Sequence, residues 1–365
     1  MSQKKKVGIF AGGVSPEHEV SLISGKNVFD AIDRDKIEPT VVGIDKDGNW
    51  VTYQDDDFVN NVDDVNKVHL KKSGKKVRLV TDINKTGLAD LETGDRIQDL
   101  DAAFLVLHGN YGEDGKIQGY FEMMNLPYVG PDVRGSAIGM DKIVAKQVLQ
   151  ANDIPVAKYL WYMKGRDPKI PYAEAEAILG KTLFIKPANA GSSIGINKVF
   201  DERGYNKAVE EAGLYDNKIL IEEHVPGREI ECSVLGNEDV RASELGEVRP
   251  NDEFYSYNAK YVDEDGAALI IPAKVKGYTR DKIQEEAVKA FKALNLEGMA
   301  RVDFLLREDG TPVLNEANTL PGFTNISMYP KLWGESGLEY SDLITELVDL
   351  AISRYERNAA LRTEK

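Results

Sequence analysis

The sequence predicts a protein with α/β and α+β regions that begins with a doubly wound α/β domain. An apolar run at residues 7–10 leads into Ala-Gly-Gly and then into an amphipathic segment at residues 19–32. Strand, glycine turn and helix in that order form the first unit of such a domain. Residues 299–324 read as a β-hairpin, and 365 residues are enough for two or three domains.

The N-terminal part continues with strands at residues 40–44 and 102–107 and a helix at 117–125. The glycines after the first strand do not fit GxGxxG, so the dinucleotide-binding fingerprint is absent. Residues 53–96 are polar and weakly periodic, and we expect this stretch to be peripheral, with a candidate strand at 76–80.

The middle of the chain contains a glycine-rich loop between two strands. A helix is predicted from residue 136 to about 151, then a strand at 183–187, and then a Gly/Ser loop at 190–196 that leads into another strand. Such a loop lays backbone amides over phosphates without side-chain obstruction, although a plain hairpin is the commoner meaning. It is not a Walker A loop, because the GK[ST] ending is missing. Further elements are predicted after it, namely strands at 219–225 and 226–234 and amphipathic helices at 279–295 and 341–354.

The hairpin concentrates oxygen-bearing side chains on one face. Because strand residues alternate faces, Arg301 shares a face with Asp303, and Glu316 shares one with Asn318. Folding gathers Asp303, Glu316 and Asn318 beside Arg301, and Mg²⁺ prefers such oxygen ligands together with substrate phosphates. The alternative is a solvated polar face. The apolar opposite face and the following Leu-Pro-Gly turn favour a cation site.

Composition excludes several classes of protein. The formal charge of −15 argues against nucleic-acid and anionic-membrane partners. No apolar run approaches the roughly 18 residues of a membrane span, and the first residues lack the longer apolar region of a secretory peptide. The single cysteine, Cys232, excludes an intramolecular disulfide, and we interpret it as a core residue. We therefore expect a cytoplasmic protein.

Several motifs, in order, resemble one family over nearly the whole chain: GGVSPEHEVSLISG, LHGNYGEDG, GMDK and the hairpin. They are similar to the ATP-grasp carboxylate-amine ligases and, within them, to the D-alanine–D-alanine ligases. The resemblance implies an ATP-grasp fold with an N-terminal pre-ATP-grasp domain, and formation of D-alanyl-D-alanine for peptidoglycan from ATP and D-alanine. It also implies two Mg²⁺ ions, for which Mn²⁺ substitutes, and a homodimer. We divide the chain into an N-terminal domain (1–135), a central ATP-grasp subdomain (136–217) and a C-terminal ATP-grasp domain (218–365).

The resemblance assigns roles around the two D-alanine molecules. Glu17 matches the glutamate that binds the ammonium of the first D-alanine, although on local grounds it could simply favour a helix dipole. His108 matches a residue of that pocket, but alone it would be read as a packed or capping histidine. The other residues implied at the reacting groups are Ser192 and Tyr261, hydrogen-bonded with Glu17; Arg301 and the Gly322 amide, at the developing oxyanion; and Ser327, at the carboxylate of the second D-alanine.

A second set of residues is implied for ATP. Lys142, Lys186 and Lys260 match lysines that face phosphates, although Lys142 on a surface helix would ordinarily be solvated. Glu222 and Glu223 match the hinge that holds adenine, whereas glutamate doublets usually face solvent. The implied nucleotide-binding set is Lys142, Lys186, Ser193, Glu222, Glu223, Val225, Glu229 and Lys260.

Two alternatives stay open. Relatives that make the ester D-alanyl-D-lactate depart from tyrosine at the position of Tyr261, so this chain favours the peptide product over the ester or another dipeptide. A regulatory nucleotide-binding protein without turnover is the other alternative. The presence of Arg301, Asp303, Glu316 and Asn318 together favours an enzyme.

Overall fold

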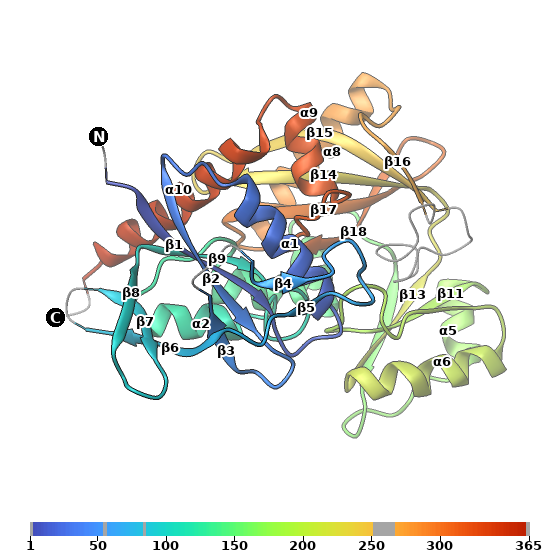
Figure 1. Ribbon diagram of the computed structural model, residues 1–365. Helices are drawn as coiled ribbons and strands as arrows, with labels where there is room; N and C mark the ends of the chain where they lie inside the picture. Colours follow the sequence, from blue (N-terminus) through green and yellow to red (C-terminus); the bar gives the residue numbers. More distant parts are fainter. Residues whose placement is uncertain (1–2, 54–56, 83–84, 251–266, 363–365) are drawn as a thin grey trace.

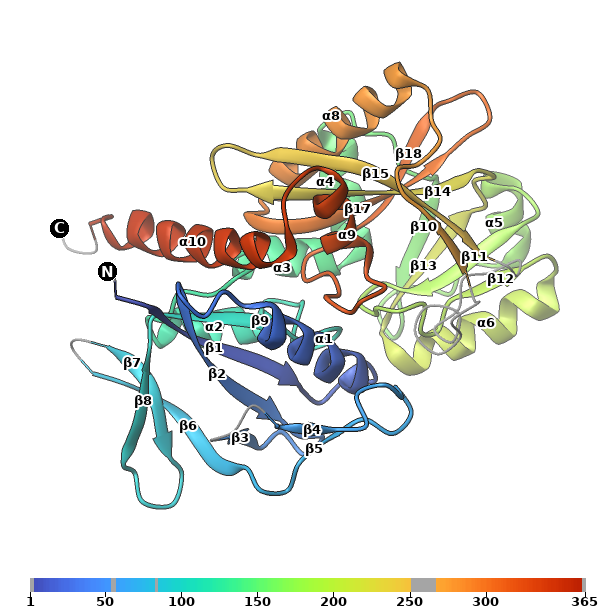
Figure 2. The ribbon, with the colours of Figure 1, turned by 45° about the horizontal axis from the view of Figure 1, so that its top comes forward.

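The computed structural model describes residues 3–53, 57–82, 85–250 and 267–362. Three larger sheets organise these residues. The N-terminal sheet lies on one side of the molecule and the other two lie next to each other (Figure 1 and Figure 2).

The N-terminal sheet has seven strands in the order β8-β7-β6-β3-β2-β1-β9. Its centre is parallel, since β1 pairs in parallel with β2 and β9, whereas β3 and β6 to β8 join by antiparallel pairing. The elements of this part are β1 (Lys5–Gly12), α1 (His18–Ala31), β2 (Ile37–Ile44), β3 (Trp50–Thr52), β4 (Val59–Asn60), β5 (His69–Leu70), β6 (Lys75–Thr81), β7 (Thr86–Asp90), β8 (Arg96–Leu100), β9 (Ala102–Val106) and α2 (Lys116–Met123).

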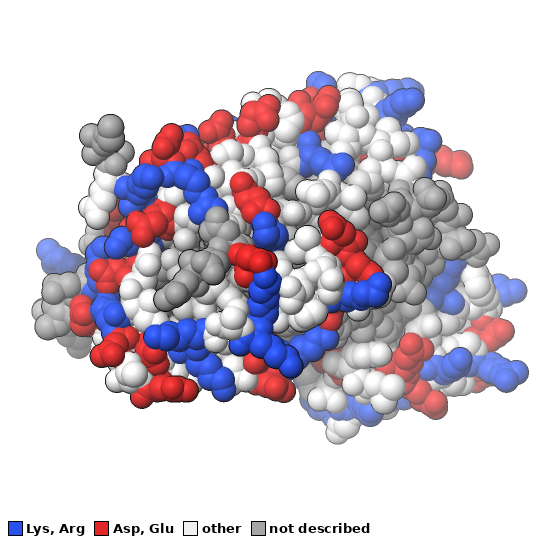
Figure 3. Space-filling model, in the orientation of Figure 1, with Lys and Arg blue, Asp and Glu red and all other residues white. Residues whose placement is uncertain are grey.

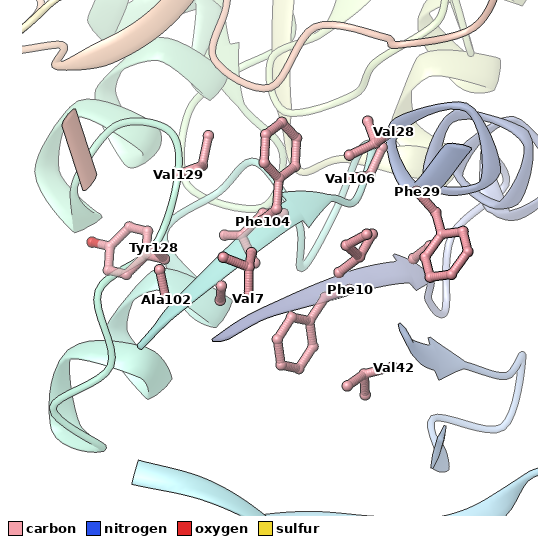
Figure 4. Close-up of a cluster of buried hydrophobic side chains, with 14 of the residues drawn as sticks. Val7, Phe10, Val28, Phe29, Val42, Ala102, Phe104, Val106, Tyr128 and Val129 are labelled. Carbon is pink, nitrogen blue, oxygen red and sulfur yellow. The ribbon is translucent and has the colours of Figure 1, made fainter. Parts of the chain in front are cut away.

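Helices α1 and α2 cover opposite faces of this sheet. A Cβ atom on Gly25 of α1 would lie 2.5 Å from the Cβ of Ala11, so glycine permits the close approach of α1 to β1. On the other face the ring centroids of Phe10 and Phe121 of α2 lie 4.9 Å apart. Figure 4 shows Phe10 and Phe104 pointing to opposite sides of β1 and β9. This arrangement confirms the predicted doubly wound start of the chain.

The expectation that residues 53–96 are peripheral is wrong for much of that stretch. Strand β6 covers the candidate strand, and β7 and β8 extend the main sheet beyond it. All five residues of β7 are buried, and Leu88 is fully buried. The sequence Thr-Gly-Leu-Ala-Asp has no alternating apolar pattern. Neighbouring elements bury this strand, and its own residues have little intrinsic strand preference, so the sequence pattern did not reveal it.

The helix predicted at residues 136–151 is two helices, α3 (Val133–Met140) and α4 (Lys142–Ala151). Asp141 separates them, because its backbone is extended and its side chain accepts hydrogen bonds from two N–H groups of the first turn of α4. A capping aspartate competes with the helical backbone, and apolar periodicity does not reveal this. The prediction of one continuous helix was therefore wrong, and Lys142 opens α4.

The central sheet is antiparallel, in the order β10-β13-β11-β12. It confirms the predicted strands at 183–187 and 219–225, and α5 and α6 pack on it around the buried ring of Tyr205. Strand β13 lies in this sheet although it follows the predicted limit at residue 217; the division into domains stays a prediction. The elements are β10 (Tyr159–Met163), α5 (Tyr172–Leu179), β11 (Leu183–Pro187), β12 (Asn197–Val199), α6 (Glu202–Tyr215) and β13 (Lys218–Glu223).

The C-terminal sheet has the order β16-β15-β14-β17-β18, with α8 and α9 packed on it. Strands β17 and β18 form the predicted hairpin, and Gly310 has φ 83° in its turn. The predicted helix at 279–295 is α8. The elements are β14 (Arg228–Gly236), β15 (Arg241–Pro250), β16 (Ala267–Ile270), α8 (Gly277–Ala293), β17 (Gly298–Leu306), β18 (Pro312–Asn318) and α9 (Met328–Glu335).

The last helix, α10 (Tyr340–Ala359), returns to the N-terminal domain and contacts β9 and α1. Its apolar residues belong to the same buried cluster as β1, β2 and β9. Arg354 is 5% exposed; its guanidinium donates to the carbonyl oxygens of Gly130 and Tyr128 and lies 4.7 Å from the centroid of the Tyr128 ring. The C-terminal helix is therefore tied to the end of the first domain.

The surface and the single cysteine agree with the composition. Figure 3 shows acidic and basic side chains interspersed over one face. Within the part of the chain that is described, none of the helices has the length and apolar run that crossing a membrane requires. Cys232 is fully buried, and burial raises the pKa of its thiol to about 12, as expected for a core residue.

Candidate active site

A cavity of about 510 Å³ lies between the central and C-terminal sheets, a size typical of small-molecule sites. Val156, just before β10, forms a bridge with Leu314 of β18 and so connects the two parts. The predicted site residues that line this cavity are Lys142, Lys186, Ser192, Ser193, Glu222, Glu223, Val225, Glu229, Arg301, Asp303 and Glu316.

Glu17 connects the N-terminal domain to the glycine-rich loop. It precedes α1 but makes no side-chain capping bond there. Its carboxylate instead accepts a hydrogen bond from the Ser192 hydroxyl. Cβ atoms on Gly109 and Gly191 would lie 2.6 Å and 2.9 Å from Glu17 Oε2, so both glycines permit the close approach of this side chain. The structure therefore brings together two of the three residues of the predicted hydrogen-bonded set.

His108 is buried close enough to Glu17 to feel its charge. Its Nδ1 donates to the carbonyl oxygen of Leu320, 3.1 Å away, and its Nε2 has no hydrogen-bond partner among the described residues. Burial lowers the pKa of the imidazole, with the charge of Glu17 acting in the opposite direction. The neutral ring therefore presents an acceptor at Nε2.

Glu113 lies close to His108 and connects the segment after β9 to Leu320. It was not predicted as a site residue. Its carboxyl accepts hydrogen bonds from the backbone N–H groups of Gly109 (2.8 Å) and Leu320 (3.3 Å). Burial and the charge of Glu17 raise the pKa of Glu113 to about 8. The LHGNYGEDG motif contains this residue, but its position depends on Leu320, which is far away in sequence.

Lys142 connects α4 with the glycine-rich loop and the hairpin. Its Nζ donates to the carbonyl oxygen of Ala190 at 2.8 Å and lies 3.4 Å from Glu316 Oε2. In the loop, Ser192 and Ser193 have φ 48° and 60°, a left-handed conformation that aims successive backbone N–H groups differently from a strand. Lys142 is therefore not a solvated surface lysine.

The hairpin places its polar residues as the alternation predicts. Asp303 is in register with Glu316, and Arg301 with Asn318. Arg301 donates from Nε and Nη2 to the two oxygens of Asp303, each at 2.8 Å, and Asn318 Nδ2 donates to Asp303 Oδ2 at 2.8 Å.

Glu231 on β14 adds a carboxylate that was not predicted. Its Oε2 lies 3.0 Å from Arg301 Nε, and it is in register with Asp303. Glu231 follows Glu229 by two residues on the same strand, so the strand period could have identified it. Arg301 is thus held between two carboxylates.

The donor set of the hairpin fits Mg²⁺. Asp303 and Glu316 supply carboxylate oxygens and Asn318 an amide, which matches the one or two carboxylates by which Mg²⁺ is usually held. The described residues include no group of three or more His, Cys, Asp or Glu that would hold a metal alone. A site of two carboxylates and an amide therefore depends on phosphate and water oxygens for its remaining ligands.

Lys186 and Glu222 form an ion pair on the floor of the cavity, with Lys186 Nζ 2.5 Å from Glu222 Oε2. Lys146, which was not predicted, pairs with the other oxygen of Glu222 from behind. Burial alone would raise the pKa of Glu222, but the two lysines outweigh it and lower the pKa to about 2. Glu222 is therefore a charged, buried residue and not a solvent-facing one.

The remaining hinge residues also line the cavity. The Glu223 carboxylate accepts a hydrogen bond from the backbone N–H of Lys158 at 2.9 Å. Lys158 directly precedes β10, so the Glu223 side chain fixes the start of that strand. Val225 is buried with Ala157 and Val313, and Glu229 lies on β14 at the cavity wall.

Gly322 and Ser327 lie together in the turn after the hairpin. Ser327 Oγ accepts from the Thr324 N–H at 2.9 Å, and a Cβ on Gly322 would lie 2.8 Å from it. These two residues do not line the cavity. Lys260 and Tyr261 fall outside the described residues.

The comparisons with known proteins agree with this geometry. The family descriptions "D-ala D-ala ligase N-terminus" and "D-ala D-ala ligase C-terminus" match residues 6–131 and 148–349. The D-alanine–D-alanine ligase of Shouchella clausii is 49% identical over 99% of this chain and 98% of its own. The chain belongs to the D-alanine–D-alanine ligase family. It is therefore a ligase.

Solved structures of similar ligases cover nearly the whole chain. The D-alanine–D-alanine ligase of Coxiella burnetii has a TM-score of 0.86 and 34% identity, over 98% of this chain and 97% of its own. The VanG D-Ala:D-Ser ligase of Enterococcus faecalis has a TM-score of 0.82 and 34% identity, over 96% of this chain and 100% of its own. The predicted ATP-grasp fold with its N-terminal domain is confirmed.

Proposed function

We propose that this ligase uses ATP to join two D-alanine molecules into D-alanyl-D-alanine. A free carboxylate does not acylate an amine, because its oxyanion is a poor leaving group. In the first step a carboxylate oxygen of one D-alanine attacks the γ-phosphorus of ATP, and ADP leaves. In the second the amine of the other D-alanine attacks the acyl carbon of D-alanyl phosphate, phosphate leaves, and the amine loses a proton.

One observation carries this proposal: lysines and an oxygen-rich hairpin face the same cavity. Lys142 and Lys186 supply positive charge from two elements, and Asp303 with Glu316 supplies carboxylates from a third. Phosphoryl transfer needs charge neutralisation and positioning more than covalent chemistry. A cavity for adenine alone would not need the hairpin face.

The nucleotide set keeps the roles that the resemblance implies. We assign Lys142, Lys186 and Lys260 to the phosphates, Ser193 to the loop over them, and Glu222, Glu223, Val225 and Glu229 to adenine and ribose. The hydrogen bond from Lys142 Nζ to the carbonyl oxygen of Ala190 supports this assignment, because it connects the lysine to the glycine-rich loop. Lysine there is a compact charge that tolerates movement of the phosphates.

The second set contains the residues that we assign to the two D-alanine substrates. Glu17, held by Ser192 and completed by Tyr261, takes the ammonium of the first D-alanine, and His108 lines its pocket. Arg301, held by Asp303 and Glu231, stabilises the oxyanion of the tetrahedral intermediate that forms in the second step, together with the Gly322 amide. Ser327 holds the carboxylate of the second D-alanine.

Asp303, Glu316 and Asn318 would hold two Mg²⁺ ions, with Mn²⁺ as a substitute. When bound, these ions polarise the phosphate oxygens and offset the developing charge. The ligase is proposed to work in the cytoplasm as a homodimer that supplies the peptidoglycan precursor for cell-wall biogenesis and cell shape.

The test is phosphate release from Mg-ATP with D-alanine as the sole amino acid, with the product identified by mass spectrometry. We expect one phosphate per dipeptide and loss of turnover when EDTA removes the metal. Absence of turnover with D-alanine would contradict D-alanine as the substrate of this ligase.

A second arm tests the acceptor. D-lactate and D-serine are added as competitors, the latter because a similar solved structure is a D-Ala:D-Ser ligase. Dipeptide of two D-alanines is expected to dominate. A dominant ester would leave the ligase assignment intact but contradict the inference from Tyr261.

A further inference from the structure

Lys146 is a fully enclosed cation next to the candidate nucleotide site. It is 2% exposed and does not line the cavity, whereas Lys142, one helical turn earlier on α4, does. Residues four apart lie on one face of a helix, so α4 presents both lysines toward the central sheet. Burying a charge this deeply is costly unless a partner compensates it.

The partner of Lys146 is Glu222, which it shares with Lys186. Lys146 takes Oε1 of Glu222 and Lys186 takes Oε2, so one carboxylate lies between two ammonium groups. The three groups together carry one net positive charge. Lys186 and Glu222 both line the cavity, whereas Lys146 does not, so Lys186 is the ammonium group of the trio that faces the cavity beside Lys142.

The register of the central sheet places an aromatic ring near each of the two lysines. Tyr159, Glu222 and Phe184 are register partners on neighbouring strands. Lys146 Nζ lies 5.8 Å from the centroid of the Tyr159 ring, and Lys186 Nζ lies 5.6 Å from that of Phe184. Each lysine thus rests over an aromatic ring on its own side of Glu222. Burial lowers the pKa of Lys146, an effect that the charge of Glu222 opposes.

We propose that Lys146 is a positioning residue for nucleotide binding, acting through Glu222. Because Lys146 pairs with one oxygen of Glu222, the negative charge of this carboxylate is shared between two lysines and does not fully neutralise Lys186. Lys186 thereby keeps net positive charge for the phosphates, and Glu222 keeps a fixed orientation toward the cavity. Without Lys146, Glu222 and Lys186 would form a closed neutral pair. This inference rests on the proposed use of ATP.

The experiment compares Lys146→Met, which keeps the chain length, with Lys146→Gln, which still donates a hydrogen bond to Glu222 and so protects folding. Each variant is measured for the KM of ATP, the KM of D-alanine, kcat, and the Kd of Mg-ATP by calorimetry without D-alanine. We expect both variants to raise the KM and Kd for ATP about tenfold, with the KM for D-alanine within about twofold. Gln147→Met, an exposed change on the same helix, is the control and should match the wild type.

A double-mutant cycle separates positioning from general packing. In a Glu222→Gln background, Lys146→Met should cause no further rise in the Kd of Mg-ATP, because the charge through which it acts is gone. An equal rise in that background, or an unchanged Kd in the single variants, would overturn the inference. A wild-type protein that does not bind Mg-ATP would instead refute the proposed function itself.

Discussion

The Glu17 carboxylate accepts a hydrogen bond from the Ser192 hydroxyl, and so joins the start of α1 directly to the glycine-rich loop of the central sheet. Two glycines, Gly109 and Gly191, clear the space around this carboxylate. The bond makes the position of the loop depend on the N-terminal domain, where the first D-alanine is proposed to bind.

Removing the Ser192 hydroxyl should slow the reaction without unfolding the protein. Hydrogen bonds to charged groups contribute about 1.5–3 kcal/mol, so kcat/KM for D-alanine should fall about 10- to 100-fold in Ser192→Ala. Ser192→Gly is the matched variant, because glycine suits the φ of 48° at this position. Both variants should lose activity alike; recovery in the glycine variant would mean that backbone strain, and not the hydroxyl, matters.

Asp303→Asn should abolish turnover with little change in stability. Asparagine keeps one acceptor for Arg301 but removes the charge that the proposed metal site requires. Phosphate release over a Mg²⁺ titration measures the effect, with Glu308→Gln, an exposed change in the turn of the same hairpin, as the control. Activity near the wild-type level at ordinary Mg²⁺ would argue against Asp303 as a ligand.

Glu247 should make stability depend on pH. Its side chain is 1% exposed and pairs with Arg228 and Arg249. The hydrogen bond from Arg228 is the main cause that lowers the pKa of Glu247 from 4.5 to about 2. A depressed folded-state pKa contributes stability above pH 4.5 that is lost as the pH falls toward 2.

Glu247→Gln should therefore lower the free energy of unfolding by about 2 kcal/mol at pH 7.5, a figure reduced for solvent screening of the exposed arginines. Urea unfolding at pH 3.5 should show a smaller difference between variant and wild type. A difference that stays constant between the two pH values would show that packing, and not charge, is lost.

Arg354→Met should destabilise the contact between α10 and the first domain. The change leaves the carbonyl groups of Gly130 and Tyr128 without their donor, at a cost of about 2–3 kcal/mol. Arg357→Met on the same helix removes exposed ion pairs with Glu238 and Glu297 and should cost less than about 1 kcal/mol. Urea midpoints compare the two, and equal effects would contradict the proposed anchoring by Arg354.

Local patterns predicted the hairpin and the start of the fold well. Alternation predicted that Arg301 shares a face with Asp303 and Glu316 with Asn318, and the register of the hairpin then places Asp303 opposite Glu316. The break at Asp141 was missed because its side chain caps the following helix instead of extending the preceding one.

The missed residues of the site depend on distant parts of the chain. Glu113 is held by Leu320 and Lys146 by Glu222, and neither partner lies within the same local pattern. Strand β7 was missed for a similar reason, since its neighbours bury it. Sequence periodicity reports the environment of one element, whereas these features arise where elements meet.

The return of α10 to the N-terminal sheet has a consequence for the order in which the chain folds. Ribosomes add about 5–20 residues per second, so on the order of ten seconds or more separate synthesis of β9 from that of α10. Until then the apolar surface that α10 covers has no native partner. The carbonyl groups of Tyr128 and Gly130 also lack the hydrogen bonds that Arg354 donates. The N-terminal sheet is therefore synthesised well before its apolar core can be completed, and its nascent form exposes apolar surface that chaperones can protect.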